Sequence, residues 1–217
     1  NYTDYLSTIP QLFHFNAFLM LSNGLEAKVG TMGSKYEFFH EWKRLKEDEV
    51  GAVDLETMLL GICNKQNFMD LLENFILFDH SGGKCAKIFA RNHQYLGVNE
   101  TVESYKARKL KNGKLGVFWH TQGSGKTLSM IWLSKWILAN NPNARVLIVT
   151  DREELDDQIE KAYKGVDENI VRTKSGEDLV NKLNSYEHPL ICSLIHKFGK
   201  NGGEVTDKDI DKYIEEI

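Results

Sequence analysis

The chain has 217 residues and carries 27 Lys plus Arg against 31 Asp plus Glu, a formal net charge of −4. With 41% hydrophobic residues and only three prolines, the composition is that of an ordinary globular chain and excludes disordered, collagen-like and coiled-coil proteins. No apolar stretch reaches the roughly 20 residues that span a bilayer, so we expect no membrane segment.

The three cysteines, Cys63, Cys85 and Cys192, are far apart and form no C-x-x-C pair, so their spacing indicates neither a zinc site nor a disulfide framework. A reduced, cytoplasmic compartment fits best. The chain begins without Met and shows no secretory signal, so we expect a fragment of a longer protein. Residues 81–114 hold eight bases against two acids. This segment either faces phosphate or forms a solvated helix face.

The first half of the chain indicates a hairpin followed by helices. Residues 11–30 read as strands around the turn Ser22-Asn23-Gly24, which predicts a β-hairpin. Apolar residues at helical spacing predict two short helices within residues 54–78. A third helix is expected at residues 94–108, ending in a loop where Gly113 suits a left-handed C-cap.

From Lys114 onward, strands and helices alternate with short connections, which is typical of a parallel α/β sheet. We predict strands at residues 115–119 and 145–150 and helices at residues 126–140 and 153–163. The alternation continues through residues 170–173, 177–184 and 189–194, and an acidic helix is expected at 207–217. The fold class is therefore α/β.

The strongest chemical signal lies between the first predicted strand of this half and the helix after it. Glycines in such a loop let backbone N–H groups turn toward an anion, and the helix N-terminus adds a positive dipole. A lysine there reaches the β- and γ-phosphates of a nucleotide, and the hydroxyl that follows it binds Mg²⁺. The sequence is His120-Thr121-Gln122-Gly123-Ser124-Gly125-Lys126-Thr127.

This loop predicts binding of ATP and Mg²⁺, with Lys126 and Thr127 as catalytic residues and Thr127 as the metal ligand. The alternative is a Gly-rich strand-to-helix turn that happens to carry Gly-Lys-Thr. His120 stands where the usual phosphate loop begins with Gly. Superfamily 2 helicases and translocases tolerate such a residue, and the loop resembles that of the restriction subunit of type I restriction-modification enzymes. No catalytic role is assigned to His120.

Further stretches resemble this family in its own order along the chain. They are Pro10-Gln11-Leu12-Phe13, Ala27-Lys28-Val29-Gly30-Thr31, Ala90-Arg91-Asn92-His93-Gln94-Tyr95, Val149-Thr150-Asp151-Arg152, Thr173-Lys174-Ser175-Gly176 and Ile195-His196-Lys197-Phe198. The resemblance implies the tail of a nuclease domain at residues 1–48, a helical linker at 49–80, and an incomplete first RecA-like P-loop domain with a parallel sheet at 81–217.

The resemblance also implies residue roles. Gln94 and Arg91 are expected to contact adenine, since a Gln amide can donate and accept at once. Thr150 and Arg152 are expected to contact the DNA backbone, although Thr150 or Asp151 could instead cap the next helix. Ser175 could likewise be a helix N-cap. Thr121, Gln122, Gly123, Ser124 and Gly125 complete the nucleotide-binding set with Lys126 and Thr127.

The implied function is that of the motor and nuclease subunit, a bacterial or archaeal type I site-specific deoxyribonuclease that couples ATP hydrolysis to translocation on double-stranded DNA and cleaves unmethylated DNA. Specificity and methyltransferase subunits would be its partners. The chain shows no Asp-Glu pair after a buried strand, and Glu26-Ala27-Lys28 fits a solvated strand better than a nuclease E-x-K, so the fragment alone is expected to be inactive. The alternatives are another superfamily 2 DNA or RNA helicase, or a noncatalytic ATP-binding fragment.

Overall fold

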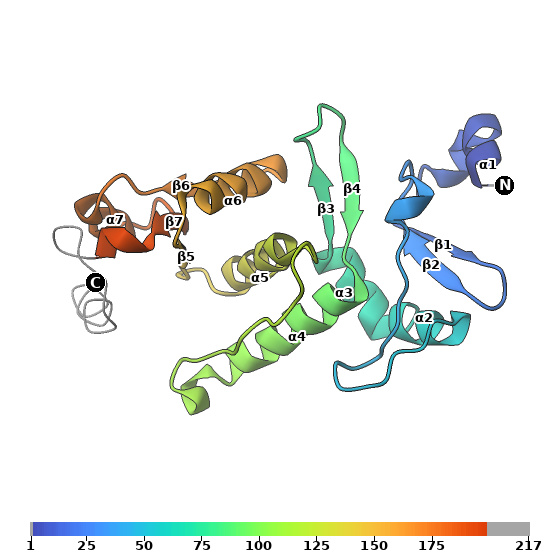
Figure 1. Cartoon of the computed structure of the whole chain (residues 1–217), viewed down its shortest axis with the longest axis horizontal. Helices are drawn as coiled ribbons and strands as arrows, with labels where there is room; N and C mark the ends of the chain where they lie inside the picture. The colour runs from blue at the N-terminus through green and yellow to red at the C-terminus, as the bar shows by residue number, and fades with distance from the viewer. Residues whose placement is uncertain (1, 199–217) are drawn as a thin grey trace. The chain divides into compact units, whose positions relative to one another are not determined.

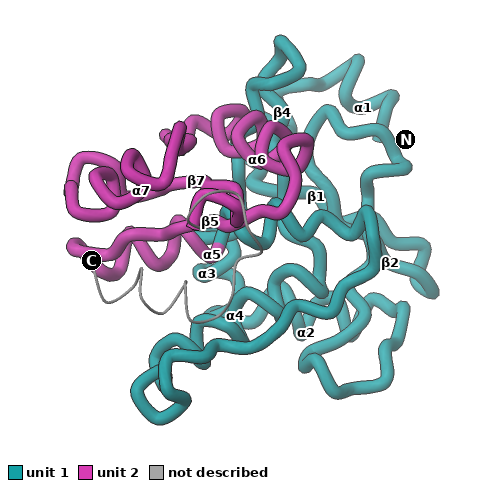
Figure 2. The backbone as a smooth tube through the Cα atoms, turned by 60° about the vertical axis from the view of Figure 1, so that its left-hand side comes forward, with its two compact units in different colours: residues 1–132 teal, residues 133–217 magenta. Residues whose placement is uncertain are grey.

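The computed structural model of the chain describes residues 2–198. It divides into two compact units, residues 1–132 and residues 133–217, and the boundary falls within helix α5 (Lys126–Asn140) (Figure 2). The two units are described separately. No helix in the described range is long and apolar enough to cross a membrane.

The first unit opens with the hairpin expected from the sequence. Helix α1 (Tyr2–Thr8) and a 3-10 turn (Pro10–Phe13) precede strands β1 (Leu19–Ser22) and β2 (Ala27–Gly30), which pair antiparallel. Asn23 shapes the turn between the strands, because its side-chain oxygen accepts hydrogen bonds from two backbone N–H groups at 3.0 and 2.8 Å. The predicted hairpin is therefore confirmed.

The two helices predicted next are also present, as α2 (Leu55–Ile62) and α3 (Lys65–Asn74). Asp54 caps the first by accepting a hydrogen bond from the Thr57 N–H, and Asn64 caps the second in the same way. A second antiparallel hairpin follows, β3 (Ile76–Asp79) and β4 (Ala86–Phe89), which the sequence did not indicate (Figure 1). Its strands have four residues each, too few to establish a period-2 pattern.

Helix α4 (Asn92–Lys106) corresponds to the predicted third helix and begins two residues earlier. It ends in a 3-10 turn (Arg108–Lys111), after which Asn112 and Gly113 adopt left-handed φ values of 49° and 78°. Gly113 therefore adopts the left-handed conformation that was predicted for it after the helix.

The strand predicted at residues 115–119 is not formed, and this prediction is wrong. Val117 and Trp119 are 85% and 93% exposed, and no strand of the described range pairs with this segment. A buried strand requires neighbours that supply its ladder of hydrogen bonds, so an apolar pattern without a partner stays irregular.

An aromatic cluster forms the centre of the first unit. The buried Trp42 ring packs against the rings of Phe89 and Tyr95, and Phe75 contacts both Tyr95 and Trp132. Because these rings come from the segment before α2, the end of α3, β4, α4 and α5, the cluster fixes the start of α4 relative to the first turns of α5. Those two elements carry the candidate site described below.

The second unit is a parallel α/β arrangement. Strands β5 (Val146–Thr150), β7 (Leu190–Leu194) and β6 (Val171–Arg172) lie side by side in that order, connected by α6 (Glu153–Gly165) and α7 (Gly176–Leu183). Every residue of the central strand β7 is buried, as expected for a strand covered on both faces. The α/β class is confirmed. The acidic helix predicted at residues 207–217 lies outside the described residues.

A buried carboxylate joins the elements of this second unit. Asp156 on α6 is fully buried and accepts hydrogen bonds from the Arg172 guanidinium and the Cys192 thiol, one on each of two strands. Burial, reinforced by this carboxylate, raises the pKa of Cys192 to about 12, so the thiol stays protonated and donates. Arg172 also pairs with the more exposed Asp157.

We predict that Asp156→Ala lowers the free energy of unfolding by about 1–3 kcal/mol, since it leaves the buried Cys192 thiol without its acceptor and removes the buried one of the carboxylates that pair with Arg172. Asp157→Ala is the matched control, because it removes the same charge from the same arginine at an exposed position and should cost at most about 1 kcal/mol. Urea denaturation of both variants measures the difference. Equal losses would contradict the central role given to Asp156.

Candidate functional site

The segment from His120 to Thr127 forms a glycine-containing loop that runs into α5. Gly123 and Gly125 have φ values of 76° and 84°, a region that favours glycine. The first helical hydrogen bonds run from the N–H groups of Leu128 and Ser129 back to the carbonyl of Gly125. The earlier N–H groups of a helix have no partner within it, and they make its N-terminus a site for anions.

Lys126 lies across this loop. Its ammonium group donates hydrogen bonds to the carbonyl oxygens of His120 and Thr121, at 2.8 and 3.0 Å. Both acceptors are neutral, so a phosphate oxygen would be the stronger acceptor for the same group. Thr127 is half-buried at the second residue of α5, whereas Thr121, Gln122 and Gly123 are exposed.

Gln94 on α4 supports the loop from beneath. Its amide nitrogen donates to the carbonyls of Ser124 and Gly125 at 3.3 and 3.0 Å, and its oxygen accepts from the Arg91 N–H at 2.9 Å. The side chain is only 2% exposed. A Cβ atom added to Gly125 would lie 2.4 Å from the amide nitrogen, so this close approach requires glycine there.

The expectation that Gln94 and Arg91 contact adenine stays a prediction. Both polar atoms of the Gln94 amide are bonded to the protein backbone, so a contact with a base would have to replace one of these bonds. Arg91 is exposed at the start of α4 and lines a pocket of about 500 Å³ next to this support.

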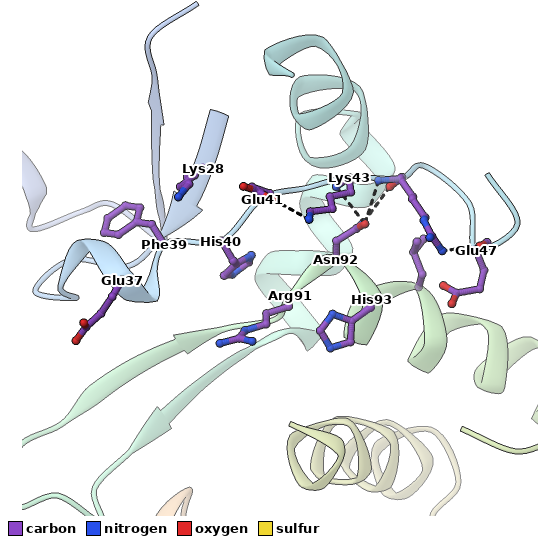
Figure 3. A pocket seen from close by; sticks show the side chains of 12 residues that line it. Lys28, Glu37, Phe39, His40, Glu41, Lys43, Glu47, Arg91, Asn92 and His93 are labelled. Atoms are coloured by element: carbon purple, nitrogen blue, oxygen red, sulfur yellow. Dashed lines mark hydrogen bonds and ion pairs between the residues drawn. The ribbon is translucent and has the colours of Figure 1, made fainter. Parts of the chain in front are cut away.

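That pocket, shown in Figure 3, lies between α4 and residues 28–47. The Asn92 side chain fastens its two walls together, accepting hydrogen bonds from the N–H groups of Lys43 and Arg44 and donating to the Arg44 carbonyl. Cations line the pocket together with three carboxylates, so its charge is mixed. The charged residues are Lys28, Lys43, Arg44 and Arg91 with Glu37, Glu41 and Glu47.

Three histidines surround the pocket and the loop. His40 is held neutral, because burial and the nearby Arg91 and His93 lower its pKa to about 4. The His93 ring nitrogen lies 3.0 Å from the Ser124 carbonyl, and its ring meets the edge of His120 at 5.0 Å. Burial, together with His93, lowers the pKa of His120. Sequence reasoning gave no role to Asn92 and His93, although both lie within the stretch from Ala90 to Tyr95 that resembles the family.

The two predicted DNA-contact residues differ in accessibility. Thr150 ends β5 and is 8% exposed, with its hydroxyl 3.4 Å from the Asp156 carboxylate. The Arg152 side chain is 72% exposed and pairs with Asp151 at 3.5 Å. The alternative that Thr150 or Asp151 caps α6 is wrong, because Arg152 occupies the N-cap and no side chain caps the helix. DNA contact by these residues remains a prediction.

Ser175, Glu26 and Lys28 lie in structural rather than catalytic surroundings. The Ser175 hydroxyl accepts a hydrogen bond from the Asp178 N–H and caps α7, which confirms the N-cap alternative. Glu26 is exposed, and the Lys28 ammonium lies over the Tyr36 ring at 4.9 Å. Within residues 2–198, no cluster of three or more His, Cys, Asp or Glu side chains could hold a metal ion.

Comparison with known proteins identifies the family of the chain. The family model of the SWI2/SNF2 ATPases matches residues 93–215, a range that begins one residue before Gln94 and includes all of the strands β5, β6 and β7. The type I restriction enzyme HindI endonuclease subunit of Haemophilus influenzae is 33% identical over 188 residues, covering 82% of this chain and 17% of that protein.

Two further relatives are similar over much of the chain. A provisionally named type I restriction enzyme MjaIXP endonuclease subunit of Methanocaldococcus jannaschii is 28% identical over 221 residues, covering 90% of this chain and 21% of its own length. A type I restriction enzyme endonuclease subunit of Staphylococcus aureus is 26% identical over 204 residues, 87% of this chain and 20% of that protein. The chain thus spans about a fifth of the length of these relatives.

We predict that Gln94→Ala weakens phosphate binding by the loop regardless of any attached base. The variant removes the amide that holds both loop carbonyls and leaves the Arg91 N–H without its acceptor, at a cost of about 1–3 kcal/mol. Affinity for inorganic tripolyphosphate, an adenine nucleotide and a guanine nucleotide should fall by the same factor, about tenfold, in titration calorimetry. Gln66→Ala, an exposed glutamine on α3, is the control. Loss confined to the adenine nucleotide would show instead that the amide contacts the base.

We also predict a pH dependence of stability from His40. Its folded pKa lies below the unfolded value of 6.5, so the unfolded chain takes up the proton first as the pH falls. This contribution is complete above pH 6.5 and is lost toward pH 4, by about 3 kcal/mol. His40→Gln should flatten the unfolding free energy over this range, whereas His14→Gln, at an exposed position, should not. Parallel curves for the wild type and His40→Gln would refute the assignment.

Proposed function

Because the chain belongs to the SWI2/SNF2 ATPase family, we propose that it is the ATP-binding part of a type I restriction endonuclease subunit. The observation that carries this proposal is the glycine loop with Lys126, held from beneath by Gln94 at the start of the matched region. The relatives match 82–90% of the chain, so the similarity includes residues before the family match.

The residues of the loop fit a nucleotide triphosphate with Mg²⁺. The buried hydroxyl of Ser124 and the Nδ1 atom of His120 have no hydrogen-bond partner among the described residues, so the loop has unused polar atoms. The N–H groups of residues 122, 123, 125 and 126 would surround the phosphates, and Lys126 would exchange its two carbonyl acceptors for phosphate oxygens. Thr127 would bind Mg²⁺, which neutralises charge on the phosphates when bound.

Binding and hydrolysis are separate steps, and the residues of the loop account for binding. We propose that Lys126 and Thr127 act in hydrolysis only together with the rest of the full protein, of which this chain matches about a fifth. That protein would be an ATP-hydrolysing type I site-specific deoxyribonuclease that translocates on double-stranded DNA. Arg152, exposed at the start of α6, and Thr150 beside it would contact the DNA backbone.

The partners and compartment follow from the same proposal. Specificity and methyltransferase subunits would direct the enzyme to unmethylated DNA, and the complex would work in the cytoplasm of a bacterium or archaeon. The alternative of another superfamily 2 helicase has less support, because the endonuclease-subunit relatives also match part of the first unit before residue 93. A noncatalytic ATP-binding piece remains compatible with the chain studied alone.

The test is titration of a fluorescent adenine nucleotide with Mg²⁺ into the chain and into Lys126→Ala. Removing a charged hydrogen-bond donor should weaken binding by about tenfold to a hundredfold. Lys65→Ala removes the same charge from an exposed position on α3 and should bind normally. Equal affinity for wild type and Lys126→Ala would refute the proposal, and a guanine nucleotide measured in parallel reports base selectivity.

A further inference from the structure

The turn at the end of α4 concentrates positive charge. Between residues 104 and 132 the chain has six lysines and arginines and not one acid, although its overall charge is −4. Five of the six fall within residues 106–114, and four of these form what we term the basic turn. Its members are Arg108, Lys109, Lys111 and Lys114.

Ion pairs with carboxylates of the described residues do not neutralise the basic turn. Of the five cations, only Lys106 has an acidic partner among the described residues, Glu103 at 2.6 Å. Lys111 donates to the Ser104 hydroxyl at 2.6 Å, and Arg108 stacks on the Tyr105 ring at 4.1 Å. These partners orient the side chains but carry no charge, so the positive charge of the turn persists.

The backbone of the basic turn is rigidly closed. The Gly113 N–H donates to the Arg108 carbonyl at 2.9 Å and the Lys114 N–H to the Lys111 carbonyl at 3.0 Å, with Asn112 and Gly113 in the left-handed region. Figure 1 shows α4 leading away from α2 and α3 to this turn. Leu110, Lys109, Lys111 and Lys114 are exposed, and Leu110 is 91% exposed, so this side of the turn is open. A preformed turn presents its cations without a large ordering cost.

Helix stabilisation does not account for this charge. Cations favour the C-terminus of a helix, but the effect falls off within the last turn. That explains Lys106, whereas Lys109, Lys111 and Lys114 lie three, five and eight residues beyond the last helical residue. Their charge points to an anionic partner outside the chain.

We propose that the basic turn binds the phosphate backbone of duplex DNA. This inference rests on the proposed function, because DNA is the polyanion on which that function acts. A duplex offers one phosphate per roughly 1.7 Å of its axis, so several lysines on one short turn can each meet a phosphate without reading sequence. A membrane surface fits less well, since interfacial segments are amphipathic helices with a continuous apolar face, whereas the basic turn is a short 3-10 turn and the exposed Val117 and Trp119 lie in the irregular chain after it.

The test uses Lys109→Gln/Lys114→Gln in the full chain. These two lysines are exposed, whereas Lys111 lines a hollow shared with Glu47 and Glu100 and is left unchanged. Fluorescence anisotropy with a labelled duplex measures affinity against salt concentration. The slope of log affinity on log salt should decrease by about 2, one for each phosphate that a lysine no longer neutralises, and by the same amount for unrelated sequences.

The control is Lys65→Gln/Lys161→Gln, which removes the same charge from exposed positions on α3 and α6 and should keep the wild-type slope. Equal slopes for the two double variants would overturn the proposal, because general charge would then explain the binding. Mg²⁺-nucleotide affinity is measured in parallel. A wild-type chain that binds nucleotide but no duplex refutes the basic turn alone, whereas duplex binding through the turn without nucleotide binding refutes the proposed function alone.

Discussion

The hydrogen bonds of the Gln94 amide are the constraint on which the candidate site depends. A single side chain joins the first turn of α4 to the loop before α5, because its oxygen accepts from one segment and its nitrogen donates to two carbonyls of the other. A buried amide with fewer partners would be costly, so these bonds fix one arrangement of the two segments. The glycine at position 125 is part of the same constraint, since any side chain there would collide with the amide.

Other contacts within the first unit also hold α4 in position. Asn92 ties the helix to the backbone of residues 43 and 44, and Tyr95 on the buried face of the helix packs against Trp42 and Phe75. The Ser124 and Gly125 carbonyls therefore face this support, while the Lys126 side chain is exposed. Preorganised donors of this kind bind an anion without a further loss of conformational freedom.

The sequence predicted well those features that depend on local pattern. The hairpin around Ser22-Asn23-Gly24, the two short helices within residues 54–78 and the alternating second unit need only turn residues and the periodicity of apolar residues. The prediction failed where pairing decides the outcome, since residues 115–119 have a strand pattern without a neighbouring strand. Within the site, the loop was recognisable from its glycines and lysine. The roles of Asn92 and His93 depend on contacts with residues about 30 to 50 positions away, which no local pattern reports.

Acidic and basic residues of the first unit are separated along the chain. A net charge of −4 suggests a chain that avoids anions, but the acid-free segment from 104 to 132 contains both the basic turn and the glycine loop. Acids elsewhere supply the negative balance, with three of them around the mixed pocket of Figure 3. Cations without acidic partners attract phosphate over a distance of about 10 Å at moderate salt. Because the acids lie elsewhere in the sequence, the basic turn and the glycine loop both favour phosphate, although the net charge of the chain is negative. On both proposals the same segment would bind nucleotide and nucleic acid, and α4 connects the support of the loop at its start to the basic turn at its end.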